Sequence, residues 1–170
     1  IMVGRLHRPK DQETLLRAIA MLGPRGQPVE LLLAGDGPDR TRLEALSREL
    51  GIAGHTRFLG TRHDIPELLG CSDVAVLSTG SEGFGIVVLE AMAAGTPVVA
   101  TDIPPCREAL GGGECGLLVP PRDPAALAGA ITKLLEDESL RRRLTEAAER
   151  RVRELYGFEK MAERYAQLLR

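Results

Sequence analysis

Short apolar runs alternate with longer stretches of helical periodicity along this chain of 170 residues. Two of the runs, residues 29–34 and 74–77, are almost continuously apolar, which is typical of strands covered on both faces. Alternation of such strands with helices predicts a parallel sheet joined by crossover helices. The predicted strands are residues 1–4, 29–34, 56–59, 74–77, 97–101 and 116–119.

Helices are predicted between these strands, and three further helical segments follow the last one. Asp123 followed by Pro124 marks a helix start, because Asp is a good N-cap and Pro fits the first helical position. The predicted helices are residues 12–22, 39–50, 65–70, 86–94, 106–110, 124–136, 140–156 and 158–170. The fold class is therefore α/β: a doubly wound, Rossmann-like, six-stranded parallel sheet with helices on both faces and a helical C-terminal extension.

Composition is that of an ordinary globular domain, with 44% hydrophobic and 27% charged residues. The net charge is -2 and aromatic residues reach only 3%, which predicts neither the basic face nor the stacking platform that nucleic-acid binding needs. No apolar run approaches the ~20 residues of a membrane-spanning helix, so no transmembrane segment is predicted.

The cysteines and histidines suggest no metal centre. The three cysteines contain no C-x-x-C pair, and the three histidines form no ligand motif, so a reduced, cytoplasmic protein without metal is expected. The excess of Arg over Lys is compatible with a bacterial origin. Because the chain opens at Ile1 inside an apolar run, we interpret it as a piece of a longer protein; whether that protein touches a membrane peripherally stays open.

Unusual residues gather in the loops that follow the first four predicted strands, at residues 4–10, 35–38, 60–64 and 78–85. These loops share the edge of a parallel sheet at which ligands bind. Arg5 and Lys10 supply two cations there, while Gly83 and Gly85 allow close backbone approach before a helix N-terminus. Such a set suits a diphosphate and could neutralise it without a metal ion.

Two carboxylates accompany these cations. Glu90 is the one polar residue of the apolar helix 86–94, so we expect it in a mostly buried helix, accepting hydrogen bonds from ligand hydroxyls. Glu82, in the glycine-rich loop, is placed to do the same. The alternatives are that Glu82 caps the following helix or lies in solvent, and that Glu90 pairs with a basic residue of the core.

Other motifs are weaker. Gly35 and Gly37 resemble the start of a dinucleotide fingerprint, but Arg40 stands where the third glycine belongs and the motif follows the second strand. No P-loop and no G-x-S-x-G elbow occur, which argues against phosphate-loop and serine-hydrolase chemistry. His7 and His63 lie on ligand-edge loops and are minor candidates for substrate contact.

Several segments together resemble a known family. The chain is similar, essentially from end to end, to the C-terminal, donor-binding half of the retaining GT-B glycosyltransferases known as glycosyl transferases group 1. The E-x7-E signature, which starts at Glu82 and ends at Glu90, is the most specific match. The remaining matching segments are residues 4–6 with Lys10, 33–38, 58–60, 81–100 and 116–119.

The resemblance implies a role for each matching residue. Arg5 and Lys10 would bind the donor diphosphate and Glu82 the transferred sugar, and these three would be the catalytic residues. Glu90 would accept hydrogen bonds from the ribose. The remaining donor-binding residues would be Gly4 at the first turn, Thr61 and Arg62 near the nucleobase, and the amides of Gly83, Phe84, Gly85 and Ile86 around sugar and phosphate.

The implied reaction is transfer of a sugar from a nucleotide-diphosphate sugar with retention of anomeric configuration, without cofactor or metal. The family's N-terminal acceptor domain is absent from residues 1–170, so we expect donor binding with little turnover. Ser78 and Thr79 replace the family's usual Pro-Ser, which could alter loop rigidity. A GT-B nucleotide-sugar epimerase half and a non-catalytic nucleotide or sugar-phosphate binding module remain alternatives. Donor base, donor sugar, acceptor and oligomeric state are left open.

Overall fold

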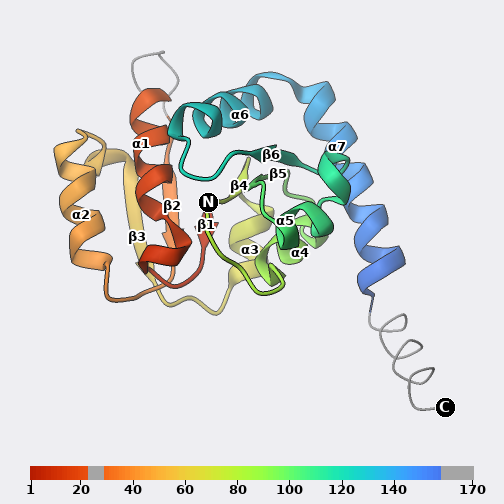
Figure 1. The fold of residues 1–170 in the computed structure, drawn as a ribbon, viewed down its shortest axis with the longest axis horizontal. Coiled ribbons are helices and arrows are strands. Elements are labelled where there is room, and N and C mark those ends of the chain that lie inside the picture. Colours follow the sequence, from red (N-terminus) through yellow and green to blue (C-terminus); the bar gives the residue numbers. More distant parts are fainter. Residues whose placement is uncertain (23–28, 158–170) are drawn as a thin grey trace.

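The computed structural model describes residues 1–22 and 29–157, so the predicted helix 158–170 lies outside the described residues. Figure 1 shows the α/β architecture, in which short strands run between helices. All six predicted strands are confirmed to within two residues at either end. They are β1 (Met2–Val3), β2 (Leu31–Ala34), β3 (Thr56–Gly60), β4 (Ala75–Leu77), β5 (Val98–Thr101) and β6 (Leu117–Val119).

The predicted helices within the described residues are also present. The expected N-cap is confirmed, because the Asp123 carboxylate accepts a hydrogen bond from the Ala126 amide at 2.8 Å. The segment predicted as one helix, 140–156, instead starts at Glu138 and changes to a π-helical turn at Val152–Tyr156. The α-helices are α1 (Gln12–Leu22), α2 (Arg40–Glu49), α3 (Ile65–Gly70), α4 (Ile86–Ala93), α5 (Pro104–Ala109), α6 (Pro124–Glu136) and α7 (Glu138–Arg151).

The strands form two parallel three-stranded ladders, β1-β2-β3 and β4-β5-β6. Ile1 joins them: its nitrogen donates to the Val74 carbonyl at 2.8 Å, and its carbonyl accepts from the Val76 amide at 2.8 Å. This pattern continues a parallel ladder between β1 and β4. The resulting strand order, 3-2-1-4-5-6, is that of a doubly wound fold, as predicted.

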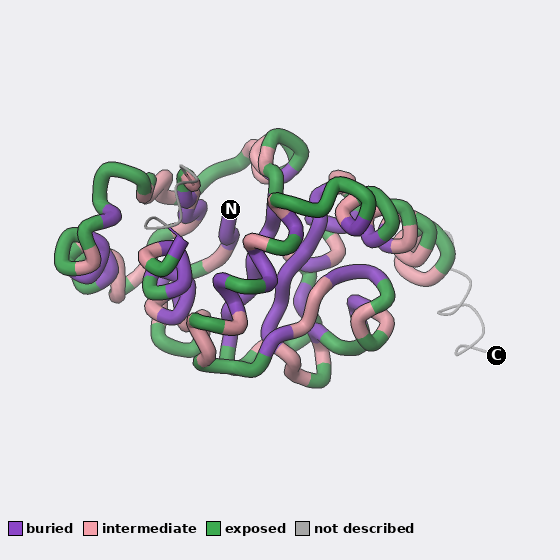
Figure 2. Tube along the Cα trace, turned by 90° about the horizontal axis from the view of Figure 1, so that it is seen from above, coloured by how far each residue is buried: buried purple, intermediate pink, exposed green. Residues whose placement is uncertain are grey.

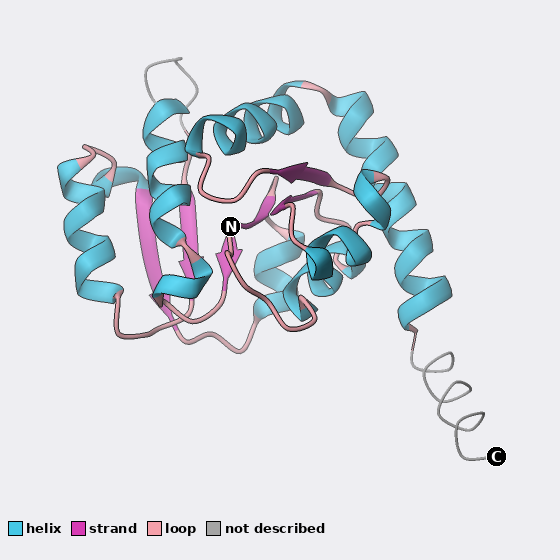
Figure 3. Ribbon diagram, viewed as in Figure 1, coloured by secondary structure: helices cyan, strands magenta, loops and turns pink. Residues whose placement is uncertain are grey.

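Helices cover both faces of the sheet (Figure 3). Helix α1 packs against α2 and α6, while α4 packs against α3, α5 and α7. Burial is greatest along β1, β2, β4 and β5, and β5 is buried at every position (Figure 2). No helix in the described ranges is long and apolar enough to cross a bilayer. Because all strands run parallel, the loops after β1 to β4 emerge at one edge.

The loops after β1 and β2 pack directly on each other. The Leu6 amide donates to the Asp36 carbonyl at 3.0 Å, and the Asp39 amide donates to the Leu6 carbonyl at 3.1 Å. Gly37 lies at the crossing, where an added Cβ would stand 2.3 Å from the Leu6 carbonyl oxygen. Only glycine fits there without displacing backbone.

Gly37→Ala should therefore destabilise the fold by about 1–3 kcal/mol, the usual cost of overpacking. Gly54→Ala is the matched control, because a Cβ at Gly54 would meet nothing within 4 Å; it should be neutral or stabilise by about 0.4–1 kcal/mol. Chemical denaturation of both variants measures the difference. Equal unfolding midpoints would contradict the packing argument.

Candidate functional site

Lys10 and Glu82 form an ion pair at the carboxyl edge of the sheet, although 72 residues separate them in sequence. Each side chain is 17% exposed, so the pair is largely shielded but still reachable from solvent. The sequence placed both residues at a ligand site without predicting that they touch. Neither alternative for Glu82, a helix cap or a solvated carboxylate, describes what is found.

Two buried hydroxyls hold the Lys10 loop in place. Ser78 Oγ donates to the Lys10 carbonyl at 3.2 Å and to the Asp11 carbonyl at 2.9 Å. Thr79 Oγ1 donates to the Pro9 carbonyl at 2.9 Å, and the Gly80 amide donates to that same oxygen at 2.9 Å. The loop after β1 is thus attached to the loop after β4 at several backbone positions.

This attachment is what the sequence did not reveal. Ser78 and Thr79 were predicted only to alter loop rigidity, yet both are fully buried. The available signal was two hydroxyl residues directly after a buried strand, since buried hydroxyls need hydrogen-bond partners. Their partners are backbone carbonyls of the facing loop.

The loop after β1 is also fixed from its own side. Asp11 has a left-handed backbone with φ of 50°, and its carboxylate accepts from the Thr14 hydroxyl at 2.7 Å. The Gln12 side chain donates to the Arg5 carbonyl at 2.9 Å. The Arg5 side chain itself is exposed, and the aliphatic part of Lys10 packs over Gly4, with Cε 3.7 Å from the position of an added Cβ.

The glycine-rich loop exposes its residues beside this pair. Gly85 is the N-cap of α4 and has φ of 74°, a left-handed conformation that suits glycine. Gly83 is exposed, as are the side chains of Phe84 (53%) and Ile86 (63%). The first turn of α4 is consequently exposed, and binding of an anion there stays a prediction.

The expected burial of Glu90 is wrong, because its side chain is exposed. Val88, Ala91 and Met92 of α4 are buried, and Val87 and Leu89 pack against the core. The exposed residues of the helix, Ile86, Glu90 and Ala93, form a single stripe. Glu90 lies one turn beyond the exposed Ile86, on the open side. Nor does it pair with a core cation, since no ion pair of Glu90 occurs among the described residues. Its role toward a ribose stays a prediction.

Thr61 and Arg62 lie on the exposed segment after β3, apart from the Lys10 loop in sequence. Arg62 Nε donates to Asp64 Oδ1 at 2.8 Å, and this hydrogen bond lowers the pKa of the Asp64 carboxyl. The segment starts at Gly60, whose carbonyl accepts from the Gly35 amide at 2.7 Å. The predicted nucleobase residues are therefore accessible, and their loop is tied to the loop after β2.

Arg40 stands at the position where a dinucleotide fingerprint would have its third glycine. It links the loop after β2 to the β3 side of the sheet. Its guanidinium donates to the Phe58 carbonyl at 3.3 Å and contacts Asp36 at 3.5 Å.

The two candidate histidines, His7 and His63, are peripheral to these contacts. His63 is exposed, and the buried Nδ1 of His7 has no partner within the part of the chain that is described.

Cys106 lies near the ion pair and was not predicted to belong to the site. Burial raises the pKa of its thiol to about 11; the Glu82 carboxylate acts in the same direction and the Lys10 ammonium against it. The side chain is fully buried. The thiol therefore stays neutral within reach of the field of the charged pair. Across residues 1–22 and 29–157, no three His, Cys, Asp or Glu side chains cluster to hold a metal ion.

Known proteins resemble the chain in both sequence and fold. The family model described as glycosyl transferases group 1 matches residues 1–151. A D-inositol 3-phosphate glycosyltransferase of Corynebacterium urealyticum is 38% identical over 99% of this chain and 42% of its own length. The lipopolysaccharide core biosynthesis glycosyltransferase LpsE of Rhizobium meliloti is 37% identical over 98% of this chain and 48% of its own length.

A solved structure agrees with these relatives. Anabaena Alr3699/HepE, crystallised in complex with UDP, superposes with a TM-score of 0.89 at 28% identity, covering 99% of this chain and 48% of that one. The chain thus spans less than half the length of each of these three proteins.

Thr79→Val should destabilise the fold by about 1–3 kcal/mol, because it removes the buried hydroxyl that donates to the Pro9 and Ser81 carbonyls. Thr41→Val, at an exposed position of α2, should change stability by less than about 0.5 kcal/mol. Urea denaturation measures both variants. A Thr79→Val protein as stable as Thr41→Val would show that the hydroxyl does not hold the two loops together.

Stability should fall as the pH rises from about 9 towards 11. The folded chain keeps the Cys106 proton that the unfolded chain loses above its usual pKa of 9.0, so the unfolded state gains in this window. Unfolding midpoints of Cys106→Ala should decline less over the same pH range.

At pH 8, iodoacetamide should label the exposed Cys71 and leave Cys106 intact. Rapid labelling of native Cys106 would contradict the raised pKa.

Proposed function

The chain belongs to the glycosyl transferases group 1 family, and we propose that it is the donor-binding half of a retaining GT-B glycosyltransferase. It binds a nucleotide-diphosphate sugar at the carboxyl edge of the sheet. The observation that carries this proposal is the Lys10–Glu82 ion pair, which is largely shielded but reachable from solvent. The exposed Arg5 and the open N-terminus of α4 belong to the same candidate site. The Lys10 ammonium suits the diphosphate of such a donor, and the Glu82 carboxylate suits the hydroxyls of its sugar.

When the donor binds, Lys10 and Glu82 separate and each binds a group of the donor instead. The diphosphate takes the place of Glu82 beside Lys10, and Arg5 and the first-turn amides of α4 complete its surroundings. The released Glu82 carboxylate then accepts hydrogen bonds from hydroxyls of the sugar. Neither charge is left without a partner, which matters because an unpaired, largely shielded charge is costly.

The same residues act on the bond that breaks. As the bond between the anomeric carbon and the diphosphate oxygen lengthens, negative charge accumulates on the leaving diphosphate. Lys10, Arg5 and the α4 N-terminus stabilise that charge more in the transition state than in the ground state. These positive groups support a reaction that needs no metal ion. Retention rests on the resemblance of the Glu82 to Glu90 segment to the family's E-x7-E signature.

The remaining donor contacts follow the same arrangement. Gly4 lets the first turn lie close to the diphosphate, Glu90 accepts from the ribose hydroxyls, and Thr61 and Arg62 flank the nucleobase. Exposure of Glu90, Thr61 and Arg62 leaves them accessible for these contacts. UDP is the nucleotide to test first, because HepE was crystallised with it.

The acceptor belongs to the rest of a longer protein. Relatives are more than twice the length of the chain, so an N-terminal acceptor domain accompanies the donor half, and residues 1–170 alone bind donor but transfer little. A reducing cytoplasm suits the three free cysteines, of which Cys71 is exposed. The bacterial sources of the relatives support a bacterial origin.

Lys10→Met should weaken binding of UDP and of UDP-glucose about 10- to 100-fold, the loss expected for a charge-assisted hydrogen bond. Glu82→Gln should keep or strengthen UDP binding, because the diphosphate no longer has to displace a carboxylate from Lys10. It should remove any advantage of UDP-glucose over UDP, because the carboxylate that accepts from the sugar hydroxyls is gone. Isothermal titration calorimetry with and without EDTA measures each Kd, and EDTA should change none. GDP and ADP in parallel identify the base.

Lys133→Met and Glu136→Gln, both exposed on α6, are the matched controls and should bind as the parent chain does. The proposal fails if Lys10→Met binds UDP normally, or if Glu82→Gln loses UDP and UDP-glucose equally. Rapid sugar transfer by residues 1–170 alone would overturn the division between donor and acceptor halves.

A further inference from the structure

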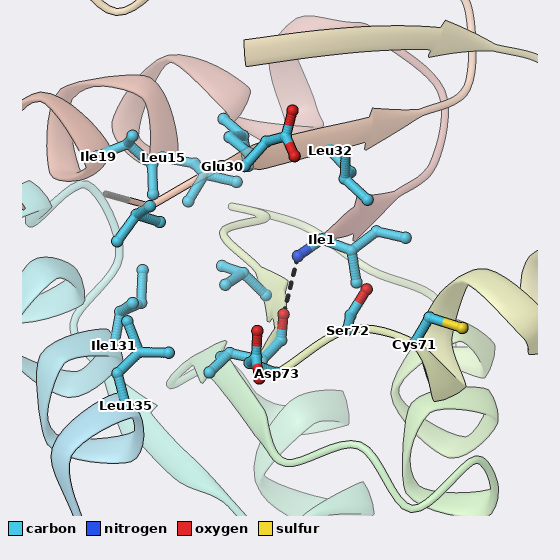
Figure 4. A pocket seen from close by; sticks show the side chains of 14 residues that line it. Ile1, Leu15, Ile19, Glu30, Leu32, Cys71, Ser72, Asp73, Ile131 and Leu135 are labelled. Atoms are coloured by element: carbon cyan, nitrogen blue, oxygen red, sulfur yellow. Dashed lines mark hydrogen bonds between the residues drawn. The ribbon is translucent and has the colours of Figure 1, made fainter. Parts of the chain in front are cut away.

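Two cavities lie at opposite edges of the sheet. The larger, of about 340 Å³, lies at the amino edge beside Ile1, and its described lining residues include none of the candidate site (Figure 4). The smaller, of about 130 Å³, lies at the carboxyl edge. It is lined by Gly83 and Phe84 of the glycine-rich loop and by Pro104, Pro105, Glu108, Ala109 and Tyr156. Of these two cavities, the smaller one therefore belongs to the candidate site.

The rings of Phe84 and Tyr156 meet at this smaller cavity. Their centroids lie 6.0 Å apart and their planes are inclined at 75°, which is the edge-to-face arrangement that aromatic pairs favour. The Phe84 side chain stays 53% exposed, so the contact covers only part of its ring. Tyr156 thus reaches the glycine-rich loop from a segment that is distant in sequence.

A π-helical turn brings Tyr156 to this place. Helix α7 ends at Arg151, and Val152–Tyr156 continue it with the wider turn of a π-helix, which occurs in short pieces and frequently at functional sites. The Arg151 guanidinium donates to the Glu108 carbonyl at 2.7 Å and to the Ala109 carbonyl at 2.9 Å, near the C-terminus of α5. The π-helical turn also packs against α4. Tyr156 is therefore fixed by helices that lie outside the loop.

The tip of the glycine-rich loop has few contacts of its own. Thr79 Oγ1 accepts from the Ser81 amide at 3.3 Å before the tip, and the Val88 amide donates to the Gly85 carbonyl at 2.8 Å after it. Across residues 1–22 and 29–157, Gly83 and Phe84 make no hydrogen bond. The contacts of the tip are thus the ion pair of the adjacent Glu82 and the Phe84–Tyr156 ring pair.

These two contacts differ in what a ligand does to them. In the proposed function the donor separates Glu82 from Lys10, so the ion pair no longer holds the loop when its amides are needed. The ring pair involves no charge and lies on the side of the loop that faces α5 and the π-helical turn. It can therefore persist while the donor is bound.

We propose that Tyr156 is a positioning residue for the donor site. By holding the Phe84 ring, Tyr156 keeps the amides of residues 83–86 arranged around the sugar and phosphate after Glu82 has left Lys10. A loop that is already ordered loses less conformational entropy when the ligand binds, which raises affinity. This role rests on the proposed function, because it concerns how the same loop receives the donor.

Tyr156→Ala should weaken binding of UDP-glucose about 3- to 10-fold, the affinity equivalent of one aromatic pair. Tyr156→Phe keeps the ring and is the matched control, so it should bind as the parent chain does. Phe84→Ala should cause the same loss as Tyr156→Ala, and the double variant should be no weaker than either single variant, because both changes remove one shared contact. Isothermal titration calorimetry measures each Kd.

A purely structural role for Tyr156 predicts a different result. Tyr156→Ala would then lower the unfolding temperature and leave the Kd for UDP-glucose unchanged, which would overturn the positioning role while the proposed function stands. Additive losses in the double variant would overturn it as well, because the two side chains would then act separately.

Backbone order parameters from ¹⁵N relaxation test the ring pair without any donor. In a Glu82→Gln background, which removes the ion pair, the order parameters of Gly83 and Phe84 should fall from about 0.85 towards about 0.6 with Tyr156→Ala and stay high with Tyr156→Phe. Equal order parameters in the two variants would overturn the positioning role. A parent chain that binds no nucleotide-sugar would overturn the proposed function instead, and the order parameters would still decide whether Tyr156 holds the loop.

Discussion

The hydrogen bonds of Ser78 and Thr79 are the constraint on which the candidate site depends. Their hydroxyls are buried away from water and donate to the carbonyls of residues 9 to 11, which belong to the other half of the sheet. Thr79 Oγ1 also donates to the Ser81 carbonyl within its own loop at 2.6 Å. Thr101, at the end of β5, donates in turn to the Thr79 carbonyl at 2.5 Å. Three loop regions are thereby linked through buried polar contacts. Moving any one of them would leave a buried hydroxyl or carbonyl unsatisfied, which costs more than the bond contributes.

This constraint explains why two residues 72 positions apart form an ion pair. Lys10 follows a carbonyl bound by Thr79, and Glu82 follows the same Thr79 by three positions, so the backbone places both before their side chains meet. The backbone therefore sets the positions of Lys10 and Glu82, and the attraction between their side chains does not have to. A site built this way is preorganised by its supporting hydroxyls, and its charges remain available for exchange with a ligand.

The fold was predictable from the sequence, whereas the contacts inside the site were not. Apolar runs such as β5 identify buried strands because both faces are covered, and Asp123 with Pro124 marks a helix start by local chemistry alone. The Lys10–Glu82 contact depends on how two loops cross, and nothing within either loop encodes the other. Glu90 was misjudged for a related reason. The apolar sequence around it indicated burial, but one stripe of α4 stays exposed, and Ile86 and Glu90 lie on it.

Contacts between the two halves of the sheet therefore act at the candidate site itself. At the carboxyl edge, glycine crossings and buried hydroxyls fix loops from both halves, so that a ligand meets prearranged charges. The two halves of the sheet are joined through β1 and β4, so the same short strand that carries the Lys10 loop also connects the ladders.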